Sequence, residues 1–157
     1  MAWFSRNAET TASDPILPLT QERIVDIFND EEWHYIIDDD GDLGGRWGDV
    51  IIYFIILGQQ KEMLQIVGRM STPIDEANHD DAMIFIEDWH RDHFWPKAYT
   101  VFDDQGMMRV CAEVNIDHEP GVTKAQLRQH VRCAVGTQMQ FFEALRERFG
   151  MPPMDEE

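Results

Sequence analysis

The chain is short of basic residues and has no long apolar run, and both shortages exclude whole classes of partner. Lys and Arg total 13 against 30 Asp and Glu, which gives a formal net charge of -17. This balance repels phosphate backbones and anionic lipid surfaces, so we expect neither a nucleic acid nor a membrane as a partner. The longest apolar run, residues 50–57, is far shorter than the ~20 residues that a membrane span requires.

Cysteine is also scarce. Cys111 and Cys133 are the only two, and they show no CxxC spacing. Free thiols in a reducing cytoplasm are the expected state. The first residues lack a basic start followed by an apolar stretch, so we expect no signal peptide and a cytoplasmic location.

Motifs that mark common catalytic and nucleotide-binding sites are absent as well. HExxH, GxSxG, Walker A and GxGxxG do not occur. We therefore expect no enzyme, no cofactor and no catalytic residue. One alternative stays open, an enzyme that uses the metal-ligand types Glu87, His90 and His93, spaced three apart. A single Glu-x-x-His supplies only part of a bundle metal site, which favours surface histidines at a helix end.

Apolar periodicity divides the chain into helices and strands. A helix is expected after the N-cap Thr20, and a final long helix after the capping box Thr123 to Gln126. Between them the pattern predicts strands at 33–37, 50–57 and 64–69, a helix at 77–93, and strands at 97–102 and 108–116. The fold class is α+β, with a five-stranded antiparallel sheet in the order α-β-β-β-α-β-β-α. Residues 1–18 are expected as a flexible N-terminal tail, 19–150 as one domain, and 151–157 as an acidic C-terminal tail.

The strand at 50–57 is apolar on both of its faces. Val50, Ile52, Phe54 and Ile56 point one way, and the opposite face carries Ile51, Tyr53, Ile55 and Leu57. Antiparallel sheets usually leave one face to solvent, which gives alternation instead. We expect another copy of the chain or a segment of a partner to cover the second face. The alternative is that helices cover both faces of the sheet.

The final helix adds residues to this predicted partner or dimer face. Arg128, Arg132, Arg146 and Met139 fall outside its apolar stripe, and basic residues are rare elsewhere. The partner or dimer face is predicted to contain Ile51, Tyr53, Ile55, Leu57, Arg128, Arg132 and Met139. A solvated helix face that balances the acidic turns is the alternative for the basic residues.

The acidic turn at 38–42 suggests a cation site. Asp38, Asp40 and Asp42 match the first three ligand positions of a calcium loop. Leu43, Arg46 and Asp49 then depart from that loop at its Gly, water and Glu positions. The sequence favours a hairpin turn whose carboxylates accept backbone N–H groups. A small-ligand or metal-ion sensor that uses the Asp38–Asp42 turn remains the alternative function.

Several short segments together resemble the YbjN-like family, described as bacterial sensory transduction regulators. They cover most of the chain in the expected order: Leu19–Ile24, Asp38–Gly44 with Trp47, Trp89 with Pro96–Tyr99, Gly121–Thr123 before Gln126 and Leu127, and Phe141–Leu145. His90 stands where the resemblance leads us to expect Asn. The resemblance implies a fold like that of the type III secretion chaperones, which are small, acidic, cytoplasmic homodimers that hold an extended client segment. It implies no catalytic residue and no role in a secretion system.

These observations lead to one main hypothesis. The chain is expected to be a non-enzymatic protein-binding module, a chaperone-like adaptor or a sensory transduction regulator. It is expected to form a homodimer and to bind a protein client or regulatory partner.

Overall fold

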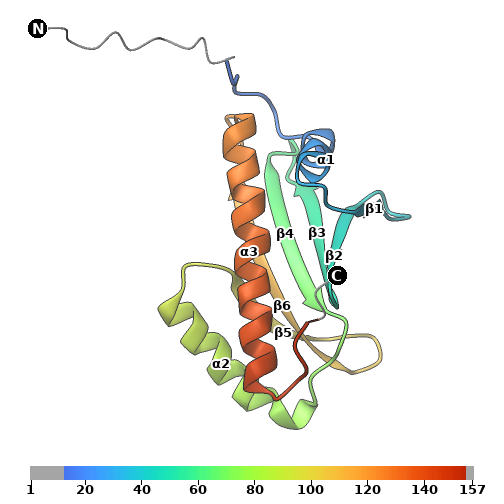
Figure 1. The fold of residues 1–157 in the computed structure, drawn as a ribbon, viewed down its shortest axis with the longest axis vertical. Coiled ribbons are helices and arrows are strands. Elements are labelled where there is room, and N and C mark those ends of the chain that lie inside the picture. Colours follow the sequence, from blue (N-terminus) through green and yellow to red (C-terminus); the bar gives the residue numbers. More distant parts are fainter. Residues whose placement is uncertain (1–12, 155–157) are drawn as a thin grey trace, which may run out of the picture.

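The computed structural model describes residues 13–154, which form one sheet and three α-helices (Figure 1). The sheet is antiparallel, with the strand order β1-β2-β3-β4-β6-β5. In chain order the elements are α1 (Gln21–Asp30), β1 (Tyr35–Ile37), β2 (Leu43–Trp47), β3 (Val50–Leu57), β4 (Met63–Met70), the short 3-10 helix η1 (Glu76–Asn78), α2 (His79–Asp92), β5 (Lys97–Phe102), β6 (Met108–Asp117) and α3 (Lys124–Arg148).

The predicted α+β class is confirmed, but the predicted count of five strands is wrong. The sixth strand is β2, whose sequence is Leu-Gly-Gly-Arg-Trp. Because of its glycines, part of this strand is predicted from the sequence as acidic turn. Its glycines make room for aromatic rings. A Cβ on Gly44 would lie 3.1 Å from the Tyr53 ring, and one on Gly45 would lie 2.6 Å from the Trp47 ring. Glycine here marks close packing within a sheet, which a pattern of strand-forming residues does not reveal.

The capping residues act as the sequence predicts. The Thr20 side chain accepts the backbone N–H of Arg23 at the start of α1. Thr123 and Gln126 form a complete capping box at the start of α3. The middle helix differs slightly, since η1 precedes it and the α-helix begins at His79.

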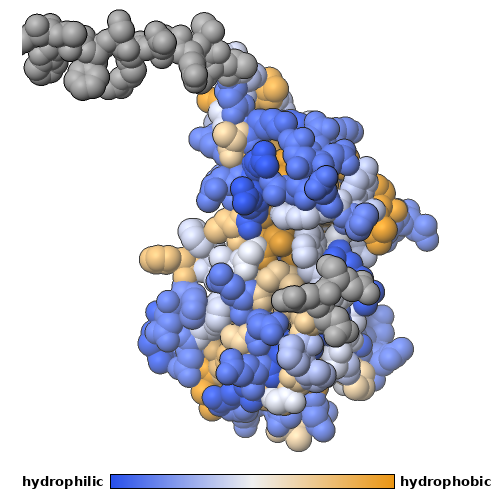
Figure 2. All heavy atoms as spheres, in the orientation of Figure 1, coloured by the Kyte–Doolittle hydropathy of each residue, from blue (hydrophilic) through white to orange (hydrophobic). Residues whose placement is uncertain are grey.

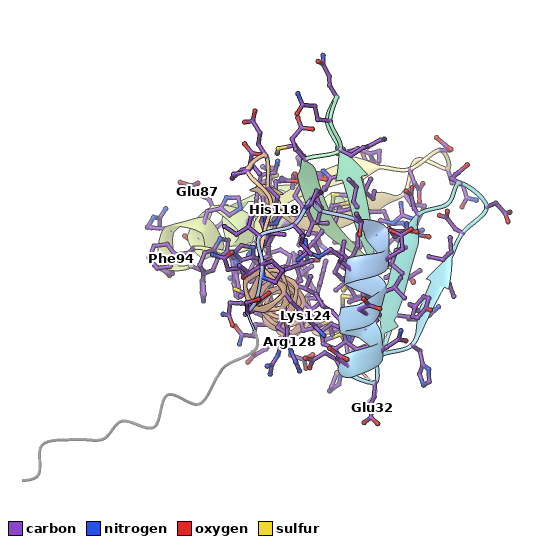
Figure 3. All side chains as sticks on the ribbon, turned by 90° about the horizontal axis from the view of Figure 1, so that it is seen from above. Glu32, Glu87, Phe94, His118, Lys124 and Arg128 are labelled. Carbon is purple, nitrogen blue, oxygen red and sulfur yellow. The ribbon has the colours of Figure 1, made fainter. Side chains whose placement is uncertain are left out.

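All three helices cover the same face of the sheet, which excludes the alternative with helices on both faces. On β3 the side chains of Val50, Ile52 and Phe54 are almost fully buried, whereas Ile51 and Tyr53 remain partly exposed. Figure 3 shows the sheet from above, with α1 and α3 together on one side of it. The hydrophobic core lies between the helices and this face of the sheet.

The chain that precedes α1 is held against the start of α3. Leu17 and Val122 exchange two backbone hydrogen bonds, and the Asp14 carboxylate accepts the N–H groups of Lys124 and Ala125. Of the two predicted tails, residues 1–12 and 155–157 lie outside the described residues. The domain boundaries stay a prediction. Within 13–154 no helix combines the length and the apolar character needed to cross a membrane.

Candidate interaction surface

The face of the sheet that carries no helix is the candidate functional surface, called the open face from here on. Side chains alternate along a strand, so the open face consists of the odd-numbered residues of β3, β4, β5 and β6 together with Ile36, Gly44 and Arg46. Figure 2 shows the opposite, helix-bearing side, where hydrophilic residues predominate.

An apolar strip runs along one half of the open face. Its members come from β1, β3 and β4: Ile36, Ile51, Tyr53, Ile55, Leu57, Met63 and Val67. Leu57 is 44% exposed and Ile36 is 59% exposed. A cavity of about 330 Å³ lies beside Gly44, and its lining includes Ile36, Ile51 and Tyr53. Contiguous apolar surface of this kind is typical of a site for a partner.

The other half of the open face is organised around a buried carboxylate, Glu113 of β6. Its side chain is only 5% exposed although no helix covers it. Four donors from three strands surround its two oxygens: Lys97 Nζ at 2.6 Å, Tyr99 Oη at 2.8 Å, Asn115 Nδ2 at 2.9 Å and Gln65 Nε2 at 3.2 Å. A buried charge is tolerated only when it is paired and hydrogen-bonded, and this network meets that condition.

The network shifts the acidities of its members. Burial acts to raise the pKa of Glu113, but the hydrogen bonds from Lys97, Asn115 and Tyr99 outweigh it and lower the pKa. Burial and the hydrogen bond to Glu113 raise the pKa of Tyr99. Burial also raises the pKa of the neighbouring Cys111, against the effect of Arg69. The carboxylate is therefore charged near neutral pH, while the phenol and the thiol stay protonated.

The charged residues of the open face differ between its two ends. One transverse row, set by the strand register, contains Arg46 of β2 and Arg69 of β4, and Arg109 of β6 lies just beyond it. Arg109 pairs with Asp103, whereas no ion pair or hydrogen bond in the described chain involves the Arg69 side chain. At the far end, the row through Leu57 and Met63 ends at Asp117.

The structure divides the predicted partner face into two separate places. Ile51, Tyr53, Ile55 and Leu57 lie together on the open face. Arg128, Arg132 and Met139 belong to α3 on the helix-bearing side, where Figure 3 shows Arg128. Both arginines reach Glu31 after α1, with closest N–O distances of 2.6 Å for Arg128 and 3.7 Å for Arg132. These two basic residues therefore balance acidic groups of the same chain.

The other candidate sites are engaged in local structure. Asp38 Oδ1 accepts the backbone N–H groups of Asp40 and Asp42, as a hairpin turn requires. His90 Nε2 accepts the N–H of Ala98 at the free edge of β5. The His93 ring stacks on Trp89 at a centroid distance of 3.6 Å. Among residues 13–154 no group of three or more His, Cys, Asp or Glu side chains is arranged to hold a metal ion.

Sequence reasoning missed the polar half of the open face. The alternation along 108–116 places Arg109, Cys111, Glu113 and Asn115 on one side, which was a usable signal. What it could not supply was the register that sets Lys97 opposite Glu113. The position of β6 between β4 and β5 brings the donors of both neighbours to this carboxylate.

A second pair of titratable groups lies between α3 and the turn after β6. The rings of His118 and His130 stack at a centroid distance of 5.3 Å, and His118 is 5% exposed. Burial lowers the pKa of His118, and the charges of His130 and Arg23 lower it further, against the effect of Asp117. Burial lowers the pKa of His130 as well. Both side chains therefore bind protons more readily in the unfolded chain.

We expect acid to destabilise the protein through this histidine pair. The two neutral histidines contribute fully to the stability of the fold above their pKa in the unfolded chain, about 6.5. The free energy of unfolding should therefore fall as the pH is lowered from about 7 to about 5. Urea unfolding at both pH values measures this loss. A variant with His118→Phe and His130→Phe keeps the two rings but removes the protonation, so its loss should be clearly smaller. An equal loss in both proteins contradicts the assignment.

Comparison with known proteins places the chain within one family. The family model described as "YbjN: Putative bacterial sensory transduction regulator" matches residues 20–147. A crystal structure of YbjN from E. coli, described as "a putative transcription regulator", has a TM-score of 0.71 and 12% identity, and the alignment covers 85% of this chain and 97% of that one. An uncharacterised protein from Methanothermobacter thermautotrophicus has a TM-score of 0.52 and 14% identity, over 83% and 99% of the two chains. No match is found among the curated proteins. The similarities to solved structures concern the fold alone.

Proposed function

Because the chain belongs to the YbjN family, we propose that it is a non-enzymatic protein-binding module that regulates a partner protein in the cytoplasm. The single observation that carries this proposal is the open face, an apolar strip beside a polar network on the face of the sheet that α1, α2 and α3 leave uncovered. The family description as a sensory transduction regulator is consistent with a role in which binding, rather than catalysis, transmits the signal.

The composition of the open face supports binding to protein. Interfaces are enriched in Tyr and Arg and depleted of Lys and Glu in their centres, and they combine an apolar core with a polar rim. Tyr53 lies within the apolar strip, and Arg46 and Arg69 lie at its border. The one carboxylate in the middle, Glu113, is already neutralised by Lys97, so a partner that covers it leaves no unpaired charge.

A chaperone-like mode of binding is part of the proposal. The eight-residue strands β3 and β4 are about 25 Å long at ~3.3 Å per residue, so this face has room for an extended segment of seven or eight residues. In this mode the partner's apolar side chains would pack on Ile51, Tyr53 and Ile55. The alternative, a ligand or metal-ion sensor built on the Asp38–Asp42 turn, lacks a supporting observation because Asp38 already accepts two backbone N–H groups.

The test places a charge in the centre of the apolar strip. Wild-type protein is isolated from its native cytoplasm at low salt, and a stoichiometric co-purifying protein, the companion, is identified by mass spectrometry. The affinity between the two purified proteins is then measured. Ile55→Asp should weaken that affinity by at least about tenfold, since an unpaired carboxylate would be buried on binding. Circular dichroism checks that the variant is folded.

A matched control comes from α2. Ile84 is 54% exposed on the helix-bearing side, so Ile84→Asp introduces the same charge away from the open face. This control should bind the companion as the wild type does. If Ile51→Asp and Ile55→Asp both retain full affinity for the companion, the open face is not its binding site.

A further inference from the structure

We infer that a second copy of this chain occupies the open face in the free protein, with the basic end of each copy on the acidic end of the other. This inference rests on the proposed function, because it takes the open face to be an interaction surface. It goes further by naming the occupant, and it implies that a client must displace the second copy.

The argument begins with the charge pattern along the strands. Arg69 and Met63 belong to the same strand, β4, and lie six residues apart, which separates their rows by about 20 Å. Arg46 shares the row of Arg69, whereas Asp117 shares the row of Met63. Between these rows one half of the surface is apolar, and in the other half the charge of Glu113 is paired with Lys97. The open face therefore has two arginines at one end of its strands and the carboxylate of Asp117 at the other.

A two-fold symmetric pair uses this pattern in only one of two orientations. If the symmetry axis runs across the strands, the row of Arg69 in one copy faces the row of Asp117 in the other, and each interface contains this contact twice. If the axis runs along the strands, Arg69 faces its own equivalent and the like charges repel. The first orientation also stacks the two apolar strips, with strands that run in opposite directions and side chains that interdigitate as in a sheet sandwich.

The size of the open face sets the strength of this pairing. Six strands about 4.8 Å apart and about 25 Å long give roughly 600 Å² per copy, or roughly 1,200 Å² in total. This value lies at the lower limit for stable protein interfaces. It predicts a reversible dimer that dissociates on dilution, which suits a surface that must also accept a client.

Exchanging the two charges tests the orientation. Sedimentation of the full chain across a concentration series should show the mass rising from 18.4 kDa toward twice that value. Arg69→Glu and Asp117→Arg should each raise the dimer dissociation constant by about tenfold or more, because each places like charges in contact. An equimolar mixture of the two variants restores both opposite-charge contacts, so its dissociation constant should return to within about threefold of the wild-type value.

The controls use the same changes on α2. Arg91→Glu and Asp92→Arg lie on exposed positions of that helix and should leave the dissociation constant unchanged. Circular dichroism and the melting temperature monitor folding, since Asp117 also accepts the N–H of Glu119. If Arg69→Glu fails to fold, Arg46→Glu from the same row replaces it.

Two results would overturn the inference. The first is a wild-type protein that stays at 18.4 kDa up to millimolar concentration. The second is a mixture of the two variants that associates no better than either variant alone. The proposed function is tested separately. If the mixture restores the dimer but Ile55→Asp leaves binding of the companion protein intact, the dimer is supported and the adaptor function is contradicted. If the protein is monomeric but Ile55→Asp abolishes companion binding, only the second copy is excluded as the occupant.

Discussion

Replacement of Asp49 by Ala is expected to lower the free energy of unfolding by about 3–5 kcal/mol, because it leaves a buried guanidinium without its counter-charge. Asp49 lies in the turn between β2 and β3, and its carboxylate pairs with Arg146 near the end of α3. The Arg146 side chain is only 6% exposed, and its remaining hydrogen bond goes to the carbonyl of Pro152. Its Nε has no hydrogen-bond partner, so loss of the carboxylate leaves a second part of the guanidinium unpaired.

Two comparisons separate this effect from general loss of charge. Asp81 and Arg148 form a similar pair on the surface, with side chains 43% and 44% exposed, so Asp81→Ala should cost less than about 1 kcal/mol. Arg146→Met should cost less than Asp49→Ala, since Met fills the buried space and the remaining Asp49, 23% exposed, can be hydrated. Urea unfolding of the three variants measures the order. Equal losses for Asp49→Ala and Asp81→Ala would show that Arg146 is solvated.

The same pair shows where the sequence misleads. By sequence, Asp49 occupies the last position of a hypothetical calcium loop, and Arg146 falls outside the apolar stripe of the final helix. The structure buries Arg146, which corrects that expectation. The two residues are 97 positions apart in the sequence. The charge of Arg146 can be buried because the carboxylate of Asp49 lies beside it. Helical periodicity describes one residue at a time, so it has no means of detecting such a pair.

Local patterns nevertheless predict much of the fold. Both capping residues, all three helices and five of the six strands follow from apolar spacing and turn chemistry. The apolar character of both faces of β3 fits a strand with one face on the core. That a second copy or a partner covers the other face stays a prediction. Strand order is different, because the placement of β6 between β4 and β5 depends on long-range pairing. For this reason the apolar half of the open face could be predicted, while the network around Glu113 could not.

Replacement of Gly68 by Ala is expected to lower the free energy of unfolding by about 2–4 kcal/mol, through overpacking and loss of a buried hydrogen bond. Gly68 is buried in β4 beneath α3. A Cβ there would lie 2.2 Å from Gln138 Oε1 and 3.2 Å from Ile52 Cγ1. Gln138 is fully buried, and its Nε2 donates to the carbonyl of Ile66 at 2.9 Å. The amide therefore cannot swing aside without giving up that bond.

The matched control, Gly136→Ala, should raise the free energy of unfolding rather than lower it. Gly136 lies on the exposed side of α3, and a Cβ there would meet nothing within 4 Å, so Gly136→Ala should stabilise the protein by about 0.5–1 kcal/mol. Urea unfolding measures both variants. Adding Gln138→Ala removes the group that the new Cβ would meet, so in that background Gly68→Ala should cost clearly less than it does alone. An unchanged cost would place the strain in the strand itself rather than at the contact between Gly68 and α3. The contrast between the two glycines then distinguishes Gly68, where the covering helix leaves no room for a side chain, from Gly136, where a side chain has room.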